Sequence, residues 1–155
     1  MAKEIERKFL LKTIPPEIAH CDSQLVYQSY LPGDYHPVRV RIIDGARAFL
    51  TVKGERENFT RDEEETQIPV KAAKMLLGAF HTPLIIKTRY IIYYDNIMWT
   101  IDHIHTPDDE DVWLAEVELS SEDQELSIPD WVANEVTHDK NYYNEVIASR
   151  TFEGD

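Results

Sequence analysis

The sequence predicts a mainly β domain of the α+β class, with a few helices flanking the strands. Three observations support this prediction. Near the N-terminus, charged residues recur at every second position in the run Glu4-Ile5-Glu6-Arg7-Lys8. Similar alternation returns in six later segments. Short turn signals such as Asp44-Gly45, which are typical of β-hairpins, separate some of these segments.

The first segment places three charged side chains on one face of an extended strand. Alternate side chains in a strand point to the same side, so Glu4, Glu6 and Lys8 share a face and Ile5 lies on the other. Two carboxylates can hold a hard divalent cation, and an ammonium group can hold the anion that this cation brings with it. A single strand of this kind is weak evidence, because solvated strand faces are often charged.

The repetition of this pattern is stronger evidence. Arginines alternate with aliphatic residues from Val38 to Ile42, and glutamates alternate with apolar residues from Ala115 to Leu119. The other charged positions in strand-like segments are Lys53, Glu63, Glu65, Lys87, Arg89 and Asp102. We therefore expect most strands to contribute to one shared charged face.

The elements follow in chain order. Strands are predicted over 3–11, 25–31, 37–43, 47–54, 61–69, 84–94, 97–104 and 112–119. Hairpin turns are predicted at 44–45, 95–96 and 107–111. Apolar residues at helical spacing predict helices over 70–80 and 141–150. Shorter helices are predicted at 15–20 and at 129–133, where Pro129 suits a first helical turn.

Length and composition indicate one globular domain. The chain has 155 residues, of which 43% are hydrophobic and 29% are charged. It contains no run of 18 apolar residues, so no membrane span is expected, and its charged N-terminus is unlike a secretory signal. Its single cysteine, Cys21, cannot form an internal disulfide. These features predict a cytoplasmic protein.

The net charge of −13 argues against nucleic-acid binding, which requires a basic surface. The basic residues are nevertheless concentrated, because six of the 16 lysines and arginines lie on the charged strand faces. An acidic exterior around a basic interior would repel long polyanions and still bind a small anion. The six residues are Lys8, Arg39, Arg41, Lys53, Lys87 and Arg89.

Two architectures accommodate strands with one apolar and one charged face. Charged side chains cannot pack in an apolar core without a cost of several kcal/mol each. Either the sheet is open, with its charged face in water and helices behind it, or it closes into a barrel with a charged, wet lumen.

The ordered set of motifs resembles the CYTH superfamily, also called triphosphate tunnel metalloenzymes. The resemblance covers about residues 1–150 as a single domain and leaves 151–155 as a tail. It rests on the ExExK motif at Glu4, Glu6 and Lys8, followed in order by Tyr30-Leu31, Arg39-x-Arg41, Thr51-x-Lys53, Arg61-x-Glu63-x-Glu65, Lys87-x-Arg89-Tyr90, Asp102, Glu116-x-Glu118 and Val136-Thr137-x-Asp139-Lys140.

This resemblance implies an eight-stranded antiparallel tunnel that binds a linear triphosphate with Mg²⁺ or Mn²⁺. The compact sequence is most similar to the bacterial tripolyphosphatases, which implies hydrolysis of inorganic triphosphate to pyrophosphate and phosphate. Class IV adenylate cyclases and nucleoside or thiamine triphosphatases are the alternatives within the superfamily. An alternative of another class is a polyphosphate or nucleotide sensor without turnover. We also expect a homodimer.

The motifs carry distinct expected roles. The best metal candidates are Glu4 and Glu6 with Glu116 and Glu118, because Mg²⁺ prefers oxygen ligands. A second metal ion could use Glu63 or Glu65, and Asp102 is a further candidate. The expected triphosphate-binding residues are Lys8, Arg39, Arg41, Lys53, Lys87, Arg89 and, by resemblance, Lys140.

Two other sets of residues have competing interpretations. By resemblance, Tyr30 is a candidate proton acceptor for the attacking water, provided that nearby positive charge lowers its pKa; packing is the alternative. Lys87 is the other catalytic candidate. His103 and His105 are spaced like metal ligands, but the sequence offers no obvious partner motif, and we expect them to be hairpin-edge residues.

Overall fold

The computed structural model describes residues 2–31, 37–80, 83–106 and 111–152, and its strands form one antiparallel sheet. The strands are β1 (Ala2–Leu11), β2 (Asp22–Leu31), β3 (Val38–Ile43), β4 (Arg47–Lys53), β5 (Thr60–Ile68), β6 (Leu84–Tyr94), β7 (Ile97–His105), β8 (Val112–Glu118) and β9 (Val132–Glu135). The helices are the 3₁₀ turns η1 (Pro16–Ala19) and η2 (Lys140–Tyr142) and the α-helices α1 (Val70–Phe80) and α2 (Asn144–Phe152).

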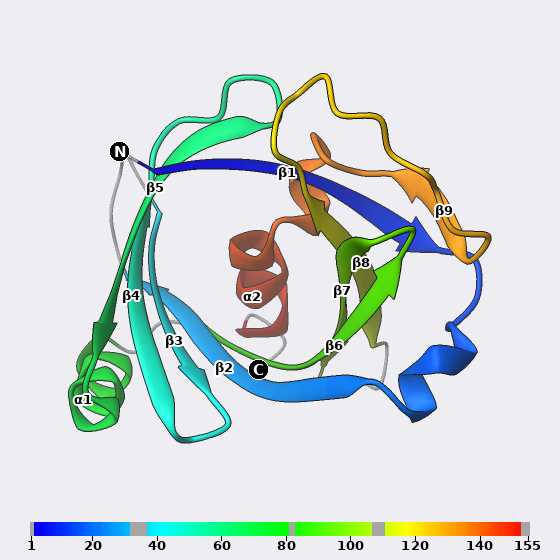
Figure 1. The fold of residues 1–155 in the computed structure, drawn as a ribbon. Helices are drawn as coiled ribbons and strands as arrows, with labels where there is room; N and C mark the ends of the chain where they lie inside the picture. Colours follow the sequence, from blue (N-terminus) through cyan, green and yellow to red (C-terminus); the bar gives the residue numbers. More distant parts are fainter. Residues whose placement is uncertain (1, 32–36, 81–82, 107–110, 153–155) are drawn as a thin grey trace.

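The sheet closes on itself. Neighbouring strands follow the order β5-β4-β3-β2-β6-β7-β8-β1, and β1 also pairs with β5. The first half of β1 pairs with β5, with Glu4 opposite Arg61, while Glu6 lies opposite Glu118 of β8. Figure 1 shows the resulting ring of strands. The predicted eight-stranded antiparallel tunnel is confirmed, and the open sheet is excluded.

Tight turns connect the strands where the sequence predicted them. Asp44 and Gly45 have φ values of 54° and 65°, and Asp95 and Asn96 have φ values of 51° and 62°. Two consecutive residues with positive φ form the type I′ turn, whose twist matches that of antiparallel strands. The predicted tip at 107–111 lies mostly outside the described residues.

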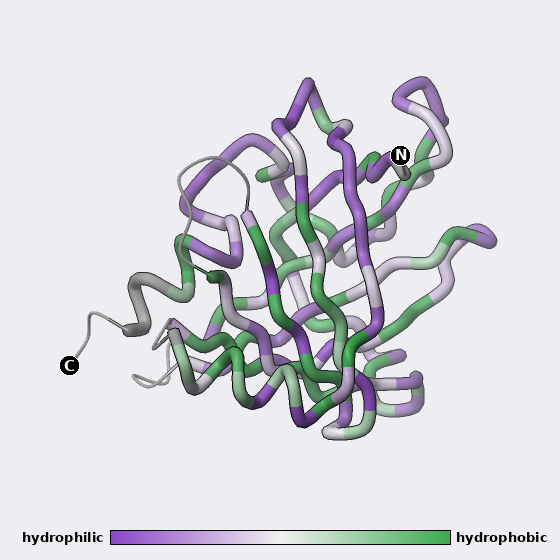
Figure 2. Tube along the Cα trace, turned by 90° about the vertical axis from the view of Figure 1, so that its left-hand side faces the viewer, coloured by the Kyte–Doolittle hydropathy of each residue, from purple (hydrophilic) through white to green (hydrophobic). Residues whose placement is uncertain are grey.

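Apolar and polar residues alternate along the strands, as the hydropathy colouring in Figure 2 shows. The outer face of β1, β7 and β8 contributes Phe9, Trp99 and Val117 to a buried cluster, which Trp131 covers from the following loop. Elsewhere on the outside, α1 packs against β3 and β4 (Figure 1), and the buried Ala73 belongs to this contact.

Helix α2 lies within the outline of the ring (Figure 1). Ile147 and Ala148 of α2 pack against Ile85, Ile104 and Leu114. These three residues lie an even number of positions from charged lumen residues of β6, β7 and β8, so they face the same side of the sheet. This apolar layer therefore closes one end of the lumen.

Two predicted helices are corrected by the structure. Residues 129–133 do not form a helix, because Val132 begins strand β9 and pairs with Leu11 of β1. Burial of Trp131 and Val132 against β1 outweighs the local signal of Pro129. The C-terminal helix also begins later than predicted, since Tyr143 is extended (φ −71°, ψ 136°) and separates η2 from α2.

The other predicted elements agree with the structure. The strands match the predicted ranges to within a few residues, the helix over 70–80 is α1, and the short helix near 15–20 is η1. Among the described residues, no helix is long and apolar enough to cross a membrane.

Replacing Ile147 with alanine tests the contact between α2 and the lumen. Ile147 is 1% exposed, so the change should lower the free energy of unfolding by about 2–5 kcal/mol. Chemical denaturation measures this loss. The matched change Leu84→Ala, at an exposed position of β6, should cost much less. Equal costs for the two variants would contradict the packing described here.

Candidate active site

The lumen contains a cavity of about 270 Å³ whose walls are densely charged. Seven glutamates and eight basic residues line it, although the whole chain has a net charge of −13. The wall is therefore close to neutral while the rest of the protein is acidic. The lining acids are Glu4, Glu6, Glu63, Glu65, Glu116, Glu118 and Glu145, and the lining bases are Lys8, Arg39, Arg41, Lys53, Arg56, Arg61, Lys87 and Arg89.

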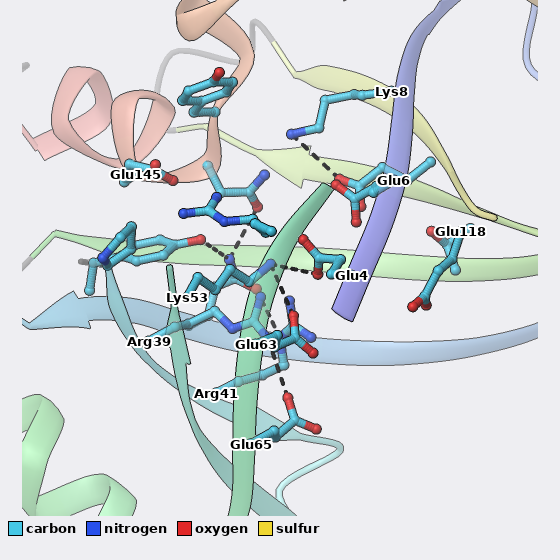
Figure 3. Close-up of a pocket in the computed structure, with 18 of the residues that line it drawn as sticks. Glu4, Glu6, Lys8, Arg39, Arg41, Lys53, Glu63, Glu65, Glu118 and Glu145 are labelled. Carbon is cyan, nitrogen blue, oxygen red and sulfur yellow. Dashed lines mark hydrogen bonds and ion pairs between the residues drawn. The ribbon is translucent and has the colours of Figure 1, made fainter. Parts of the chain in front are cut away.

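Strands β1 and β8 bring four of the predicted metal ligands together. Their pairing places Glu6 opposite Glu118 and Lys8 opposite Glu116. Figure 3 shows Glu4, Glu6 and Glu118 on the β1 side of the cavity, with Glu145 on the α2 side. Glutamates from two paired strands thus converge because the alternation on each strand points them into the lumen.

Crowding of these carboxylates disfavours their charged forms. Burial, and then the charges of Glu116 and Glu4, raise the pKa of Glu6 from 4.5 to about 8. Burial also raises the pKa values of Glu4 and Glu118. Two lysines, Lys8 and Lys53, contact this group of four glutamates, so negative charge is in excess on this side of the lumen.

Glu116 differs because the positive charges near it outweigh the effect of burial on its pKa. Burial alone would raise its pKa, but the charge of Lys8, whose Nζ lies 3.5 Å from its Oε1, lowers the pKa to about 2. Burial lowers the pKa of Lys8, but the negative charges around it, Glu116 and Glu6 first among them, together raise it by more. Lys8 also donates a hydrogen bond to the backbone oxygen of Tyr142 at 3.0 Å.

Strands β4 and β5 contribute a second group of opposite charges. Lys53 Nζ lies 2.9 Å from Glu4 Oε2 and 3.5 Å from Glu63 Oε2. Glu65 accepts a 2.8 Å hydrogen bond from Thr51 and lies 3.5 Å from Arg39. The Glu63 and Glu65 pair therefore lies in the same cavity as Glu4, as the spacing of the two motifs predicted.

Asp102 has both carboxylate oxygens in ion pairs. Arg89 donates to Oδ1 and Oδ2 at 2.8 Å each, and Lys87 Nζ lies 2.8 Å from Oδ2. The side chains of Asp102 and Lys87 are each 1% exposed. These pairs hold the pKa of Asp102 well below its usual range, although burial opposes this. Asp102 is not one of the described residues that line the cavity, and its carboxylate holds the two bases in place.

Positive charge is in excess on the basic side of the lumen, where the two acids Asp102 and Glu65 lie beside four bases, Arg39, Arg41, Lys87 and Arg89. Burial, and then Arg39 and Arg89, lower the pKa of Arg41 to about 9. Burial, opposed by Asp102, lowers the pKa of Lys87 to about 7. An anion placed here would stabilise the charged forms of both groups, just as a cation would for Glu6 on the other side.

Tyr30 lies among these bases, but its pKa does not fall. Burial raises the pKa of its hydroxyl above 10.0 by more than Arg39 lowers it. Its oxygen accepts a 3.0 Å hydrogen bond from Gln28, which also accepts one from Arg41 at 3.1 Å. The lowering that a proton acceptor requires is therefore not found in this state of the protein.

Lys140 does not join the other predicted residues. It begins η2, is exposed, and is not one of the described residues that line the cavity. In its place, α2 contributes Asn144 and Glu145, which sequence analysis missed. Asn144 Oδ1 accepts hydrogen bonds from Lys87 at 2.9 Å and Gln28 at 3.1 Å. Neither residue belongs to an alternating strand pattern, so that signal could not find them.

The acidic side has the properties of a metal site. Its donors are all carboxylate oxygens, which hard divalent cations prefer. Among the described residues, Glu4 Oε1 is buried without a hydrogen-bond partner. A buried carboxylate oxygen without a partner is costly, and a bound cation would satisfy it.

Sequence and structure comparisons place the chain among known proteins. An inorganic triphosphatase of Acetivibrio thermocellus is 32% identical over 154 residues, which covers 98% of this chain and 97% of the relative. One of Nitrosomonas europaea is 37% identical over 150 residues, covering 94% and 96%. A crystal structure of an inorganic triphosphatase superposes with a TM-score of 0.67 at 33% identity, covering 96% of this chain and 95% of the other.

A putative adenylate cyclase from Bacillus halodurans shares the fold, with a TM-score of 0.56 at 18% identity over 99% of this chain and 88% of the other. The family model of the CYTH domain matches residues 2–151. The chain therefore belongs to the CYTH family.

Proposed function

We propose that this protein is a divalent-metal-dependent triphosphatase that hydrolyses inorganic triphosphate to pyrophosphate and phosphate. The observation that carries the proposal is the separation of charge in the lumen. Crowded carboxylates on the β1 and β8 side face a group of arginines and lysines on β3 and β6. A metal–triphosphate complex supplies the missing charge on both sides. The names of two relatives that match nearly the full chain support the same activity.

The metal-binding residues in this proposal are Glu4, Glu6, Glu116 and Glu118, and the ion is Mg²⁺ or Mn²⁺. A second ion would use Glu63 and Glu65. When bound, such ions neutralise phosphate charge and make a coordinated water more acidic. Asp102 is assigned instead to positioning Lys87 and Arg89, because its oxygens are already in ion pairs with them.

The basic residues bind and stabilise the triphosphate. Each guanidinium group of Arg39, Arg41 and Arg89 can donate two parallel hydrogen bonds to a pair of phosphate oxygens. Lys8, Lys53 and Lys87 act as point charges. Charge that develops on the phosphoryl and leaving-group oxygens is stabilised by donors that are already in place. Lys87 is the principal catalytic candidate among them, because it is buried and held between Asp102 and Asn144.

We assign Tyr30 to orientation by hydrogen bonding and not to proton abstraction. Its raised pKa leaves the hydroxyl protonated at neutral pH. Carboxylates of the lumen remain to accept the proton of water. The single cysteine favours a cytoplasmic setting, and a homodimer stays our prediction.

The proposal is tested by measuring phosphate release from tripolyphosphate, ATP, thiamine triphosphate and pyrophosphate, with Mg²⁺, Mn²⁺ or EDTA. We expect metal-dependent release that is fastest with tripolyphosphate and abolished by EDTA. Formation of cyclic AMP from ATP would assign the protein to the cyclases instead. Tight binding of tripolyphosphate without phosphate release would indicate a sensor.

Removing a single lumen charge should abolish most of the activity. Glu6→Gln, Arg41→Ala and Lys87→Ala should each lower the rate of tripolyphosphate hydrolysis at least about 100-fold, equivalent to about 2.7 kcal/mol of transition-state stabilisation. The matched changes Glu64→Gln and Lys71→Ala, at exposed positions, should leave the rate unchanged. Wild-type rates in the three lumen variants would refute the site.

The role of Tyr30 is tested by Tyr30→Phe, which removes only the hydroxyl. As an orienting group it should contribute less than about 10-fold to kcat, because a hydrogen bond of this kind is worth about 1 kcal/mol. Steady-state kinetics with tripolyphosphate measures the effect. A loss as large as that of Glu6→Gln would restore Tyr30 as the proton acceptor.

Crowding of the metal-site carboxylates should appear in the pH dependence of stability. The pKa of Glu6 is about 8 in the folded protein and 4.5 ordinarily. The stability that the protonated Glu6 carboxyl contributes is therefore fully present below pH 4.5 and is lost as the pH rises through 8. Between pH 5 and 7, in EDTA, the unfolding free energy of wild type should fall relative to Glu6→Gln by up to about 1.4 kcal/mol per pH unit.

Chemical denaturation across this range measures the difference directly. Lys87 and the other lumen groups are present in both proteins, so their titration cancels to first order. Parallel pH profiles for the two proteins would show that the Glu6 carboxyl is not held protonated.

A further inference from the structure

Three potential metal ligands meet on the outside of the barrel, away from the lumen carboxylates. His103 and His105 lie on β7, two residues apart, on the face opposite Asp102, and Asp111 immediately precedes β8. One ligand atom from each of the three side chains lies within 4.8 Å of the others. Pairing of Ile104 with Val112 brings the end of β7 beside the start of β8 and so assembles the group.

Neighbouring side chains hold the two imidazole rings. His103 stacks on Trp113 with ring centroids 4.0 Å apart and planes at 10°, and Trp113 in turn stacks on Tyr90 at 6.3 Å. The centroids of His103 and His105 are 4.4 Å apart. His105 Nε2 lies 3.1 Å from Thr88 Oγ1. Restriction of the rings reduces the entropy that ordering them around an ion would cost.

Asp111 already contacts this pair. Its Oδ2 lies 2.5 Å from His103 Nε2, and its Oδ1 accepts a 3.3 Å hydrogen bond from the backbone nitrogen of Thr106. Two ligands at zinc distances and a tetrahedral angle would be about 3.4 Å apart, so the His103–Asp111 contact must open by about 1 Å to admit an ion. This movement involves exposed or partly exposed side chains and no buried packing.

We propose that His103, His105 and Asp111 form a second metal site, which binds a divalent transition-metal ion of the Zn²⁺ type. Two imidazoles and one carboxylate are a ligand set that zinc uses with a water in the fourth position. Binding releases the proton of the His103–Asp111 hydrogen bond to solvent and replaces this bond with two metal–ligand bonds. The sequence alone did not reveal this site, because Asp111 is brought to the histidines by strand pairing.

The two metal sites should differ in the ions that they select. The lumen offers carboxylate oxygens, which suit Mg²⁺ and Mn²⁺, whereas imidazole nitrogen favours Zn²⁺, Ni²⁺ and Cu²⁺. This proposal does not depend on the triphosphatase activity, since no lumen residue takes part in it. Saturating Mg²⁺ should therefore occupy the lumen and leave the outer site open to Zn²⁺.

Calorimetric titration of Zn²⁺ into tag-free protein, in saturating Mg²⁺, tests the proposal. We expect one equivalent to bind to wild type, and at least about 10-fold weaker binding in His105→Gln and in Asp111→Asn. The control His20→Gln changes an exposed histidine at the end of η1 and should bind as wild type does. Circular dichroism establishes that each variant is folded.

Tryptophan fluorescence gives a second readout of the same site. Cu²⁺ held by His103 would lie next to the stacked Trp113 and should quench its emission with a one-to-one titration. His105→Gln should shift this titration to at least about 10-fold higher Cu²⁺ concentration. Zinc binding and quenching that are the same in wild type, His105→Gln and Asp111→Asn would overturn the proposal, as would the absence of Zn²⁺ binding to wild type.

Discussion

The structure depends on charge balance inside a closed barrel. Asp102 is 1% exposed, and a carboxylate that deep is tolerated only because Arg89 and Lys87 contact both of its oxygens. This cluster lies on β6 and β7, next to the apolar layer with which α2 closes one end of the lumen. The outer faces of the same strands supply the hydrophobic core. One alternating pattern therefore places core residues on the outside of the barrel and charged residues within it.

Balance over the whole lumen does not mean balance at each point. Glu6 on one side has a pKa raised to about 8, while Arg41 on the other has a pKa lowered to about 9. Both shifts begin with burial, and like-charged neighbours add to them. Buried like charges therefore repel one another on both sides of the lumen, and a cation and a polyanion bound together would relieve this repulsion. A loss of folding stability from such repulsion is expected of a binding site and would serve no purpose in a structural module.

Much of the barrel could be predicted because burial imposes the two-residue alternation on each strand. The lumen positions of Glu6, Arg41 and Lys87 follow from it directly. Features set by tertiary contacts were missed or mistaken. Residues 129–131 lead into the edge strand β9 beside β1 in place of a helix, and Glu145 enters the cavity on a helix that has no alternating pattern. The pKa of Tyr30 rises because burial, which sequence cannot measure, outweighs the nearby arginines.

The central claim is that the lumen holds a triphosphate and its metal ion on opposite charged sides. A crystal structure with Mn²⁺ and imidotriphosphate, which resists hydrolysis, tests it most directly, because anomalous scattering locates the manganese. The account predicts manganese at about 2.2 Å from oxygens of Glu4, Glu6, Glu116 or Glu118, with phosphate oxygens at Arg41 and Lys87. Manganese away from these carboxylates, or a triphosphate bound outside the lumen, would contradict it.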